Sequence, residues 1–444
     1  MCIARLCLAP LVLTTLMFTP VTLASDSPHS ALEAPVEWDV SSPNYSASVQ
    51  EIPLSVDQGT WMNLDVSPDG KRIAFDLLGD IYQIPIEGGE AAPLLHGHAW
   101  EVQPQYSPDG RFLAFTSDRD GADNIWAMEI ANPANKQQIT HERFRLLNNP
   151  TWHPSGHYLA AKKHFTTSRS LGTGEIWLYG ARLEQALERS NLQGSVLVEK
   201  PTPAFQKELG EPTFSADGRS VFFIQNTTPG NTFIYHEDSN GEVMAIKRYD
   251  LETGEVEKIV GGAGGAVRPT PSPDGKSLAF VKRVRAASRL FVLNLESGEQ
   301  TMLVDDLDPD MQETWAVQGA YPTMEWMPDG KTIIYWSKGK IWRVNVASGA
   351  IKNIPFSVND SRTAYPAVEV AVDVAPDTLK TTMPRFGTQS PDSRSIVFES
   401  MGRVYIQRNG ADAQRLTRDS QSAHEFSPAF SPDGKDVYFI SWSD

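Results

Sequence analysis

One short phrase recurs along the chain, and it constrains the fold more than any other feature. It reads SPDGKRIAF at residues 67–75, and related copies begin at Ser107, His153, Ser215, Ser272, Met327, Ser390 and Ser431. The eight copies follow one another at spacings of 40, 46, 62, 57, 55, 63 and 41 residues. A period of this length is typical of repeat architectures, in which each copy is one structural unit.

Each copy predicts the tip of a β-hairpin. Proline presets φ near −65° at the second position of the turn, and glycine accepts a positive φ at the fourth. An apolar stretch follows the turn, as in residues 73–75 and 278–280, and a short segment with a proline and an aromatic residue precedes it, as in residues 104–107. Both flanking segments have the composition of strands.

The second copy shows the whole unit, because four strand-like segments (VQPQYS, RFLAFTS, NIWAMEI and QIT) follow one another around it. Four strands in about 40 to 60 residues, repeated around an axis, indicate the blades of a β-propeller. We predict an all-β fold, a β-propeller of four-stranded antiparallel blades, with about seven complete blades plus a partial eighth. A β-sandwich is the alternative, but it does not predict one phrase recurring eight times.

The order of strands sorts the loops onto two faces. Pro-Asp-Gly tips join first to second strands, and Gly turns such as Gly254 and Gly298 join third to fourth, so both kinds share one face. The remaining connections are long and variable, among them residues 166–174, 226–241, 305–320 and 358–383. Variable loops on a rigid scaffold commonly carry binding. On this loop-rich face we predict a binding site among Trp100, Arg145, Arg169, Arg283, Arg285 and Trp315.

The two ends of the chain carry separate predictions. Residues 1–24 read as a signal peptide, with Arg5, an apolar run at 6–18 and a small-residue cleavage site at Ala24. Residues 25–48 are expected to be extended, and residues 49–444 to form a propeller that stops within its last blade. Residues 50–56 resemble an orphan fourth strand. Both cysteines lie inside the signal peptide, so we expect a periplasmic or secreted protein without disulfides.

Composition and motifs argue against several kinds of chemistry. A net charge of −16 disfavours nucleic acid as a partner. The chain has no Gly-x-Ser-x-Gly nucleophile elbow, and the pair His96 and His98 has no further ligands at a defined spacing. We therefore assign no catalytic residue, no metal site and no cofactor, and expect no membrane span after signal cleavage.

The repeat resembles a known family. The pattern Pro-x-aromatic-Ser-Pro-Asp-Gly, followed by Ala-Phe-x-Ser-Asp-Arg-Asp-Gly and Ile-Trp, is similar to the TolB-type, WD40-like β-propeller repeat over nearly the whole mature chain. The stretches DVSPDGKRIAFDLLGDIY and DMQETWA also resemble the N-terminal propeller region of exported bacterial amidohydrolase-family proteins. That resemblance implies a metal-dependent hydrolase domain outside this chain. Prolyl-oligopeptidase-like propellers are more distantly similar.

Three functional hypotheses follow. The first is an exported, non-catalytic propeller that binds a protein, peptide or glycan, or gates the substrate of an amidohydrolase-type domain. The second is an enzyme in its own right, with peptidase or amidohydrolase activity. The third is a periplasmic interaction protein of the Tol–Pal type.

Overall fold

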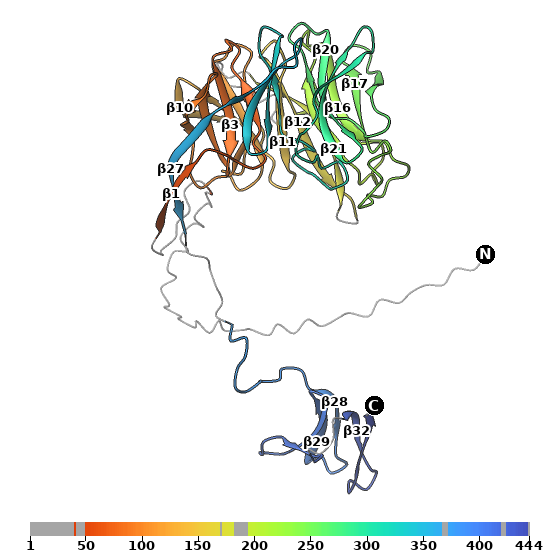
Figure 1. Ribbon diagram of the computed structural model, residues 1–444. Coiled ribbons are helices and arrows are strands. Elements are labelled where there is room, and N and C mark those ends of the chain that lie inside the picture. The colour runs from red at the N-terminus through yellow and green to blue at the C-terminus, as the bar shows by residue number, and fades with distance from the viewer. Residues whose placement is uncertain are drawn as a thin grey trace, which may run out of the picture. The chain divides into compact units, whose positions relative to one another are not determined.

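The computed structural model describes residue 40 and residues 49–168, 171–181, 194–365, 372–418 and 423–442 (Figure 1). The predicted signal peptide, residues 1–24, lies outside the described residues. The chain divides into two compact units, residues 1–366 and 367–444. The range 49–444 that we predicted as one propeller region therefore spans both units.

Within its described residues, the first unit contains six four-stranded antiparallel sheets, each built from strands in chain order. Sheet one has β2 (Leu64–Val66), β3 (Arg72–Leu77), β4 (Asp80–Pro85) and β6 (Ala92–Leu95). Sheet two has β7 (Glu101–Tyr106), β8 (Phe112–Ser117), β9 (Asn124–Glu129) and β10 (Asn132–Gln138). Sheet three has β11 (Leu147–Trp152), β12 (Tyr158–Thr166), β13 (Gly172–Gly180) and β14 (Ser195–Val198).

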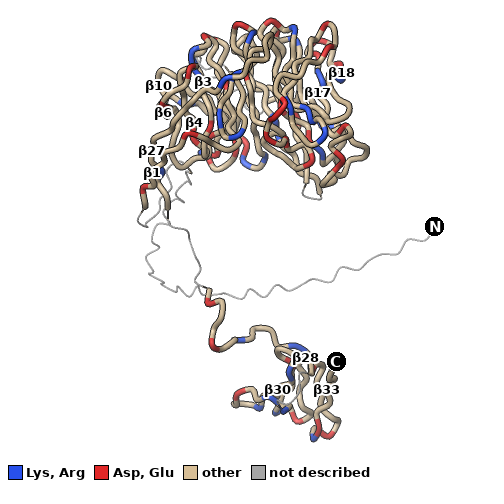
Figure 2. The backbone as a smooth tube through the Cα atoms, in the orientation of Figure 1, with Lys and Arg blue, Asp and Glu red and all other residues tan. Residues whose placement is uncertain are grey.

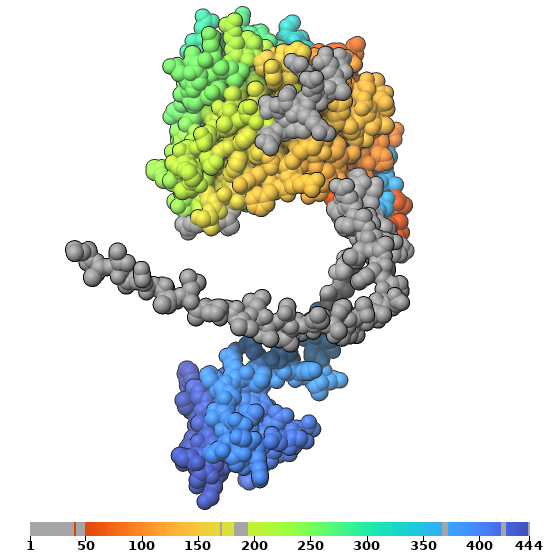
Figure 3. All heavy atoms as spheres, turned by 180° about the vertical axis from the view of Figure 1, so that it is seen from behind, coloured from red at the N-terminus to blue at the C-terminus, as the bar shows by residue number. Residues whose placement is uncertain are grey.

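The next three sheets repeat the same order. Sheet four has β15 (Leu209–Phe214), β16 (Ser220–Asn226), β17 (Met244–Asp250) and β18 (Val256–Val260). Sheet five has β19 (Val267–Pro271), β20 (Ser277–Val284), β21 (Ala287–Asn294) and β22 (Gln300–Val304). Sheet six has β23 (Glu325–Trp326), β24 (Thr332–Ser337), β25 (Lys340–Asn345) and β26 (Ile351–Ile354). In Figure 3 the colours of successive sheets follow one another around the surface, from orange through yellow to green.

Burial follows the position of a strand within its sheet. The second strand β8 is buried along its whole length, because sheets pack against both of its faces. The fourth strands β18 and β22 are mostly exposed. The first strand β11 is again fully buried, close to the axis of the ring. This gradient from axis to rim is the one expected for propeller blades.

The ring of the first unit closes through contacts between its first and sixth sheets. The Leu64 amide donates to Thr323 Oγ1 at 2.8 Å, and the Gly59 amide donates to the carbonyl of Gly339 at 2.9 Å. The indole of Trp336 donates to the Gly59 carbonyl at 2.8 Å. Backbone groups, a threonine hydroxyl and an indole therefore join the two sheets, and no described strand is shared between them.

Residues 50–56 do not form the orphan fourth strand that we predicted. They form β1 (Gln50–Val56), which pairs antiparallel with β27 (Phe356–Ala364), the strand that follows sheet six. The start of β27 also pairs in parallel with β5 (Gly89–Glu90) in the turn of sheet one. We call β1, β5 and β27 the clasp. β1 and β27 pair along seven residues. No local sequence pattern indicates that β27 is the partner of β1.

The second unit holds a seventh four-stranded sheet and a two-stranded one. The former has β28 (Arg385–Gln389), β29 (Ser395–Ser400), β30 (Arg403–Arg408) and β31 (Gln414–Arg415), and the latter β32 (His424–Phe430) and β33 (Val437–Trp442). The predicted all-β fold of seven complete four-stranded units and a partial eighth is confirmed. Within the described residues no helix is long and apolar enough to cross a membrane.

Candidate functional site

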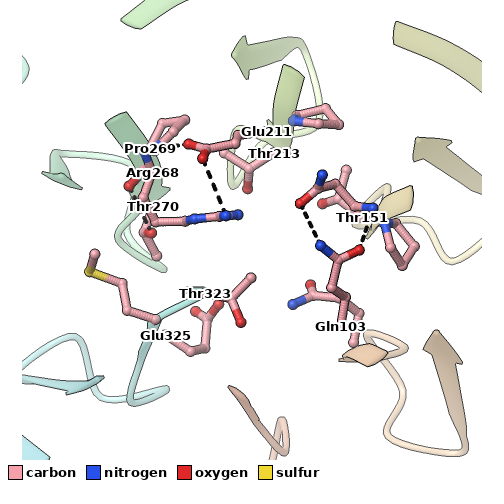
Figure 4. Close-up of a pocket in the computed structure, with 14 residues that line it drawn as sticks. Gln103, Thr151, Glu211, Thr213, Arg268, Pro269, Thr270, Thr323 and Glu325 are labelled. Atoms are coloured by element: carbon pink, nitrogen blue, oxygen red, sulfur yellow. Dashed lines mark hydrogen bonds and ion pairs between the residues drawn. The ribbon is translucent and has the colours of Figure 1, made fainter. Parts of the chain in front are cut away.

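The axis of the ring is lined by polar side chains that occupy the same two positions in, or just before, successive first strands. One position holds Asn63, Gln103, Asn149, Glu211, Arg268 and Thr323, and the other, two residues later, holds Asp65, Gln105, Thr151, Thr213, Thr270 and Glu325. Most of them surround a cavity of about 40 Å³ (Figure 4). This volume suits a few water molecules, so the axis is too narrow here to hold a peptide or a sugar.

A bulge in the first strands turns these side chains towards the axis. Gln103, Asn149, Glu211 and Arg268 each precede a proline and have φ between 50° and 59°. Left-handed backbone is costly for such residues and persists only where the surroundings hold it. Side chains of one sheet supply that support to the next, since Gln103 Oε1 accepts from the Asn149 amide at 2.7 Å and Glu211 Oε2 from the Arg268 amide at 2.6 Å.

The connection between sheets five and six crosses the axis on the loop-rich side. We call residues 315–321 the axial segment. Five side chains from sheets two to five bond to its backbone. Gln103 donates to the carbonyl of Gln318 at 2.8 Å, and Arg268 donates to the carbonyl of Tyr321 at 2.7 Å. Asn148 and Lys162 both donate to the carbonyl of Val317, at 3.1 and 2.9 Å. Glu211 accepts a hydrogen bond from the amide of Ala320 at 2.6 Å. The axial segment therefore closes this end of the axis.

Two hollows lie beside this connection on the loop-rich face. The tryptophan hollow, about 460 Å³, is lined by Trp61, Asp123, Leu146, Asn148, Met311 and residues 315–319. The arginine hollow, about 640 Å³, is lined by Tyr235, His236, Glu237, Ser239, Asn240, Arg283, Arg285, Ala286, Pro309, Asp310, Glu313 and Thr314. The connection supplies residues to both, so one stretch of backbone separates them.

Both indoles of the tryptophan hollow are held from behind. Trp61 packs against Tyr321 and Trp336, with ring centroids 5.9 and 6.2 Å apart. Trp315 packs edge-on against His164 at 5.3 Å, and its indole donates to the carbonyl of Gly172 at 3.3 Å. These contacts give the hollow rigid aromatic walls before any ligand arrives, which limits the entropy lost on binding.

His164 lies beneath Trp315 and is itself buried. Neither ring nitrogen has a hydrogen-bond partner within the described part of the chain. Burial, together with repulsion from Lys162 and Arg145, lowers the pKa of His164 to about 4. The imidazole is consequently neutral near pH 7, and it supports Trp315 through ring packing alone.

Charges around the arginine hollow are largely paired. Arg283 bonds to Asp310 at 2.8 Å and also contacts Glu313. The buried Lys207 pairs at 3.5 Å with Glu237, which lines the hollow. Figure 2 shows acidic and basic residues interspersed over the loops of the ring. These ion pairs connect the loops that line the hollow and hold them in place.

The structure distributes the predicted site residues over several places. Arg283 and Arg285 line the arginine hollow, and Trp315 lines the tryptophan hollow. Trp100 is half exposed beside Gly79, and the guanidinium of Arg145 lies 4.7 Å from the ring centre of Phe165. Arg169 lies outside the described residues.

The sequence did not identify three important residues of the tryptophan hollow. Among the other copies of the repeat, the one that begins at Met327 has an aromatic residue, Tyr321, at the position of Trp61, so no aromatic pattern shared by all the copies marked Trp61. Asp123 lies in the short turn between β8 and β9, where no motif singled it out. Met311 lies in the variable connection 305–320, which strand order had assigned to the loop-rich face. Within the described residues, no group of three or more His, Cys, Asp or Glu side chains could hold a metal ion.

Comparison with known proteins identifies relatives over parts of this chain. No protein-family profile matches it. It is 24% identical to the Tol-Pal system protein TolB of Francisella tularensis subsp. holarctica over 249 residues, which cover 54% of this chain and 50% of TolB. It is 27% identical to the uncharacterized peptidase YuxL of Bacillus subtilis over 197 residues, 36% of this chain and 29% of YuxL.

A third relative is dipeptidyl aminopeptidase BIII of Pseudoxanthomonas mexicana, 22% identical over 255 residues, which cover 51% of this chain and 36% of that protein. The chain thus spans half or less of the length of these three relatives. Among solved structures, TolB from Acinetobacter baumannii superposes with a TM-score of 0.47 at 15% identity, over 68% of this chain and 66% of that one. The chain is a TolB-like β-propeller, related in sequence to TolB and to parts of peptidases.

Proposed function

We propose that this chain is an exported, non-catalytic binding module that holds peptide segments on the loop-rich face of its ring. The observation that carries this proposal is the tryptophan hollow, in which two fixed indoles, Leu146 and Met311 surround about 460 Å³. A concave, mostly apolar site with a few polar groups is the usual form of a small-ligand site. Its walls suit an apolar or aromatic side chain of a peptide.

The closed axis favours binding of a ligand at the loop-rich face and disfavours passage of the ligand through the ring. The axial segment is fixed by side chains from four sheets, and the cavity behind it measures about 40 Å³. A ligand that enters the tryptophan hollow therefore meets the axial segment as its floor. In this role the ring presents a ligand or restricts its access to a neighbouring site, such as a hydrolase domain.

Two further observations favour a peptide ligand and an exported protein. Two of the relatives described above are named as peptidases, which supports a peptide-like ligand. The predicted signal peptide supports a periplasmic or secreted location. The resemblance of the repeats to exported amidohydrolase-family proteins supports a further part of this proposal, a neighbouring hydrolase domain of the amidohydrolase type.

Fluorescence polarisation with a mixed set of labelled hexapeptides tests the proposal on the purified chain. We expect binding, weakened by about tenfold in Trp315→Ala and in Trp61→Ala, because each indole forms one wall. Trp100→Ala is the matched control, since Trp100 lines neither hollow. The proposal fails if no peptide binds, or if all three variants bind like the unaltered chain.

A mass-spectrometric assay of the same peptides separates the binding module from an enzyme. We expect every peptide to remain intact after prolonged incubation with the chain. Turnover that disappears in a variant with both His96 and His98 replaced by alanine would overturn the non-catalytic role.

The similarity to TolB supports a second candidate, a partner within the Tol–Pal system. Pull-down with the peptidoglycan-associated lipoprotein tests it directly. A stable complex would favour this role over peptide binding, and the absence of a complex would remove it.

A further inference from the structure

A single carboxylate lies in the wall of the tryptophan hollow without a partner. Asp123 is half-buried in the turn between β8 and β9, and its side chain makes no hydrogen bond or ion pair with any described residue. Asp123 lines the same hollow as Trp61, Trp315 and the backbone of the axial segment. A carboxylate partly removed from water without compensation has a free-energy cost that a bound cation would offset.

The charged groups around Asp123 do not supply that cation. Arg119, in the same turn, is occupied by the buried carboxylate of Glu101. Lys162 is paired with Glu208, and it also donates to the backbone of Val317 from below.

The neighbouring charged group that acts on Asp123 is itself negative. Burial raises its pKa, and repulsion from Asp118 raises it further. Asp118 itself accepts a hydrogen bond from the backbone amide of Trp100 at 2.7 Å. The potential at this end of the hollow therefore favours a positive group.

We propose that Asp123 binds a cationic group of the peptide ligand, with the indoles of Trp61 and Trp315 beside it. This inference rests on the proposed peptide-binding function and specifies which peptides the hollow selects. The cation is either the ammonium group at a peptide N-terminus or the side chain of a lysine or arginine. A carboxylate supplies the ion pair, and an aromatic ring face attracts the same cation through its quadrupole.

Four versions of one binding hexapeptide test the inference on the unaltered chain. They are the peptide with a free N-terminus, its N-acetylated form, an N-acetylated form with one lysine, and the same form with norleucine in place of lysine. We expect the N-acetylated and norleucine forms to bind about tenfold more weakly than at least one of the two cationic forms. The cationic form that binds more tightly identifies the source of the charge. This comparison needs no variant and so does not depend on the folding of one.

Asp123→Asn then tests the residue. We expect it to bind cationic and neutral peptides alike, because the amide keeps the shape of the side chain and loses its charge. Asp120→Asn is the matched control, since Asp120 is exposed in the same turn and the substitution makes the same change in net charge. The control should keep the preference of the unaltered chain for cations.

Two results would overturn the inference and leave the proposed function standing. One is equal binding of all four peptides by the unaltered chain. The other is a preference that Asp123→Asn retains as fully as Asp120→Asn does. If no version binds at all, both the inference and the proposed function fail.

Discussion

The Ser-Pro-Asp-Gly turn is held by its own side chains. Ser67 Oγ donates to Asp69 at 2.7 Å and accepts from the amide of Arg72 at 3.0 Å, while Asp69 accepts from the amide of Lys71 at 3.1 Å. The turns that begin at Ser107, Ser215, Ser272, Ser390 and Ser431 contain the same three bonds. In these six copies the phrase therefore stabilises its turn through bonds within the turn itself.

Removing the acid from one such turn should weaken it. Asp109 accepts from Ser107 Oγ at 2.6 Å and from the Arg111 amide at 3.1 Å, so we expect Asp109→Ala to lower the free energy of unfolding by about 1 kcal/mol. Asp329→Ala is the matched control, because Met327 replaces the serine and only the Lys331 amide bonds to Asp329. Urea unfolding measures both. Equal effects would contradict this account of the phrase.

The same turn predicts a loss of stability in acid. Burial opposes the shift, but the bonds from Ser107 and Arg111 hold the pKa of Asp109 below its ordinary value. The ionised aspartate therefore contributes stability above about pH 4, and this contribution disappears as the pH falls through the folded-state pKa. The difference in unfolding free energy between the unaltered chain and Asp109→Ala should accordingly shrink in acid.

Two acids at the axis predict the opposite dependence on pH. Burial raises the pKa of Asp65 to about 7, against hydrogen bonds from Tyr106 and Val66 that lower it. Burial, and the nearby Asp65, also raise the pKa of Glu325 well above its ordinary value. The folded chain thus keeps protons that the unfolded chain releases, and stability falls as the pH rises from about 4 through about 7.

Replacing Glu325 by glutamine should remove part of this dependence. We expect the melting temperature of Glu325→Gln to fall less between about pH 5 and about pH 8 than that of the unaltered chain. Gln can still accept the amide of Trp326, which bonds to Glu325 at 2.9 Å. Glu296→Gln, an exposed acid in sheet five, is the control. Parallel melting curves for both variants would contradict the shared burial of the two acids.

At the scale of elements, the clasp joins the end of sheet six to sheet one. The Gly89 amide donates to the carbonyl of Pro355 at 2.9 Å, and Phe356 packs against Phe75 at 5.2 Å between ring centres. Gly88 has φ 93°, and an added Cβ would lie 2.1 Å from the same Pro355 oxygen. Only glycine fits here, because the turn of sheet one receives the backbone of β27.

Charged and phenolic groups extend the clasp along β27. Arg362 contacts the buried Asp80 at 3.0 Å, and the hydroxyl of Tyr82 donates to Asp360 at 3.0 Å. These contacts reach over 270 residues along the chain. The clasp thus reinforces the closure of the ring from outside its sheets.

Truncating the apolar anchor of the clasp should be costly. Phe356 is buried, so we expect Phe356→Ala to lower the free energy of unfolding by about 3–5 kcal/mol. Phe144→Ala is the matched control, because Phe144 is 80% exposed and the same substitution removes no core contact. Thermal unfolding followed by circular dichroism measures both. A small effect at Phe356 would show that the ring closes without the clasp.

At the scale of the whole molecule, the first unit has all the contacts that it needs to close. Its first and sixth sheets meet directly, and the clasp is drawn from residues on both sides of that junction. We expect a polypeptide of residues 49–365 to fold by itself and to unfold in one cooperative transition. Strong binding of a dye for exposed apolar surface, with no cooperative transition, would contradict this expectation.

The turns and strands of the fold could be predicted because local interactions determine them. The turn of Ser107 is held by bonds within six residues, and the four strands around it follow from short-range apolar patterns. The face that carries the variable loops follows from strand order alone. Trp315 and Arg285 were selected for that face, and both line hollows on it.

Which distant segments of the chain meet depends on tertiary packing. Local sequence is sufficient to specify the repeated turn, the four-stranded unit and the loop-rich face, because each arises from residues near one another in the chain. β1 meets its partner β27 across more than three hundred positions of the chain. The closure of six sheets in the first unit, and the meeting of Trp61, Asp123 and Trp315 in one hollow, also join residues far apart in the chain. No local pattern specifies such contacts, since they depend on the number and packing of the sheets between them.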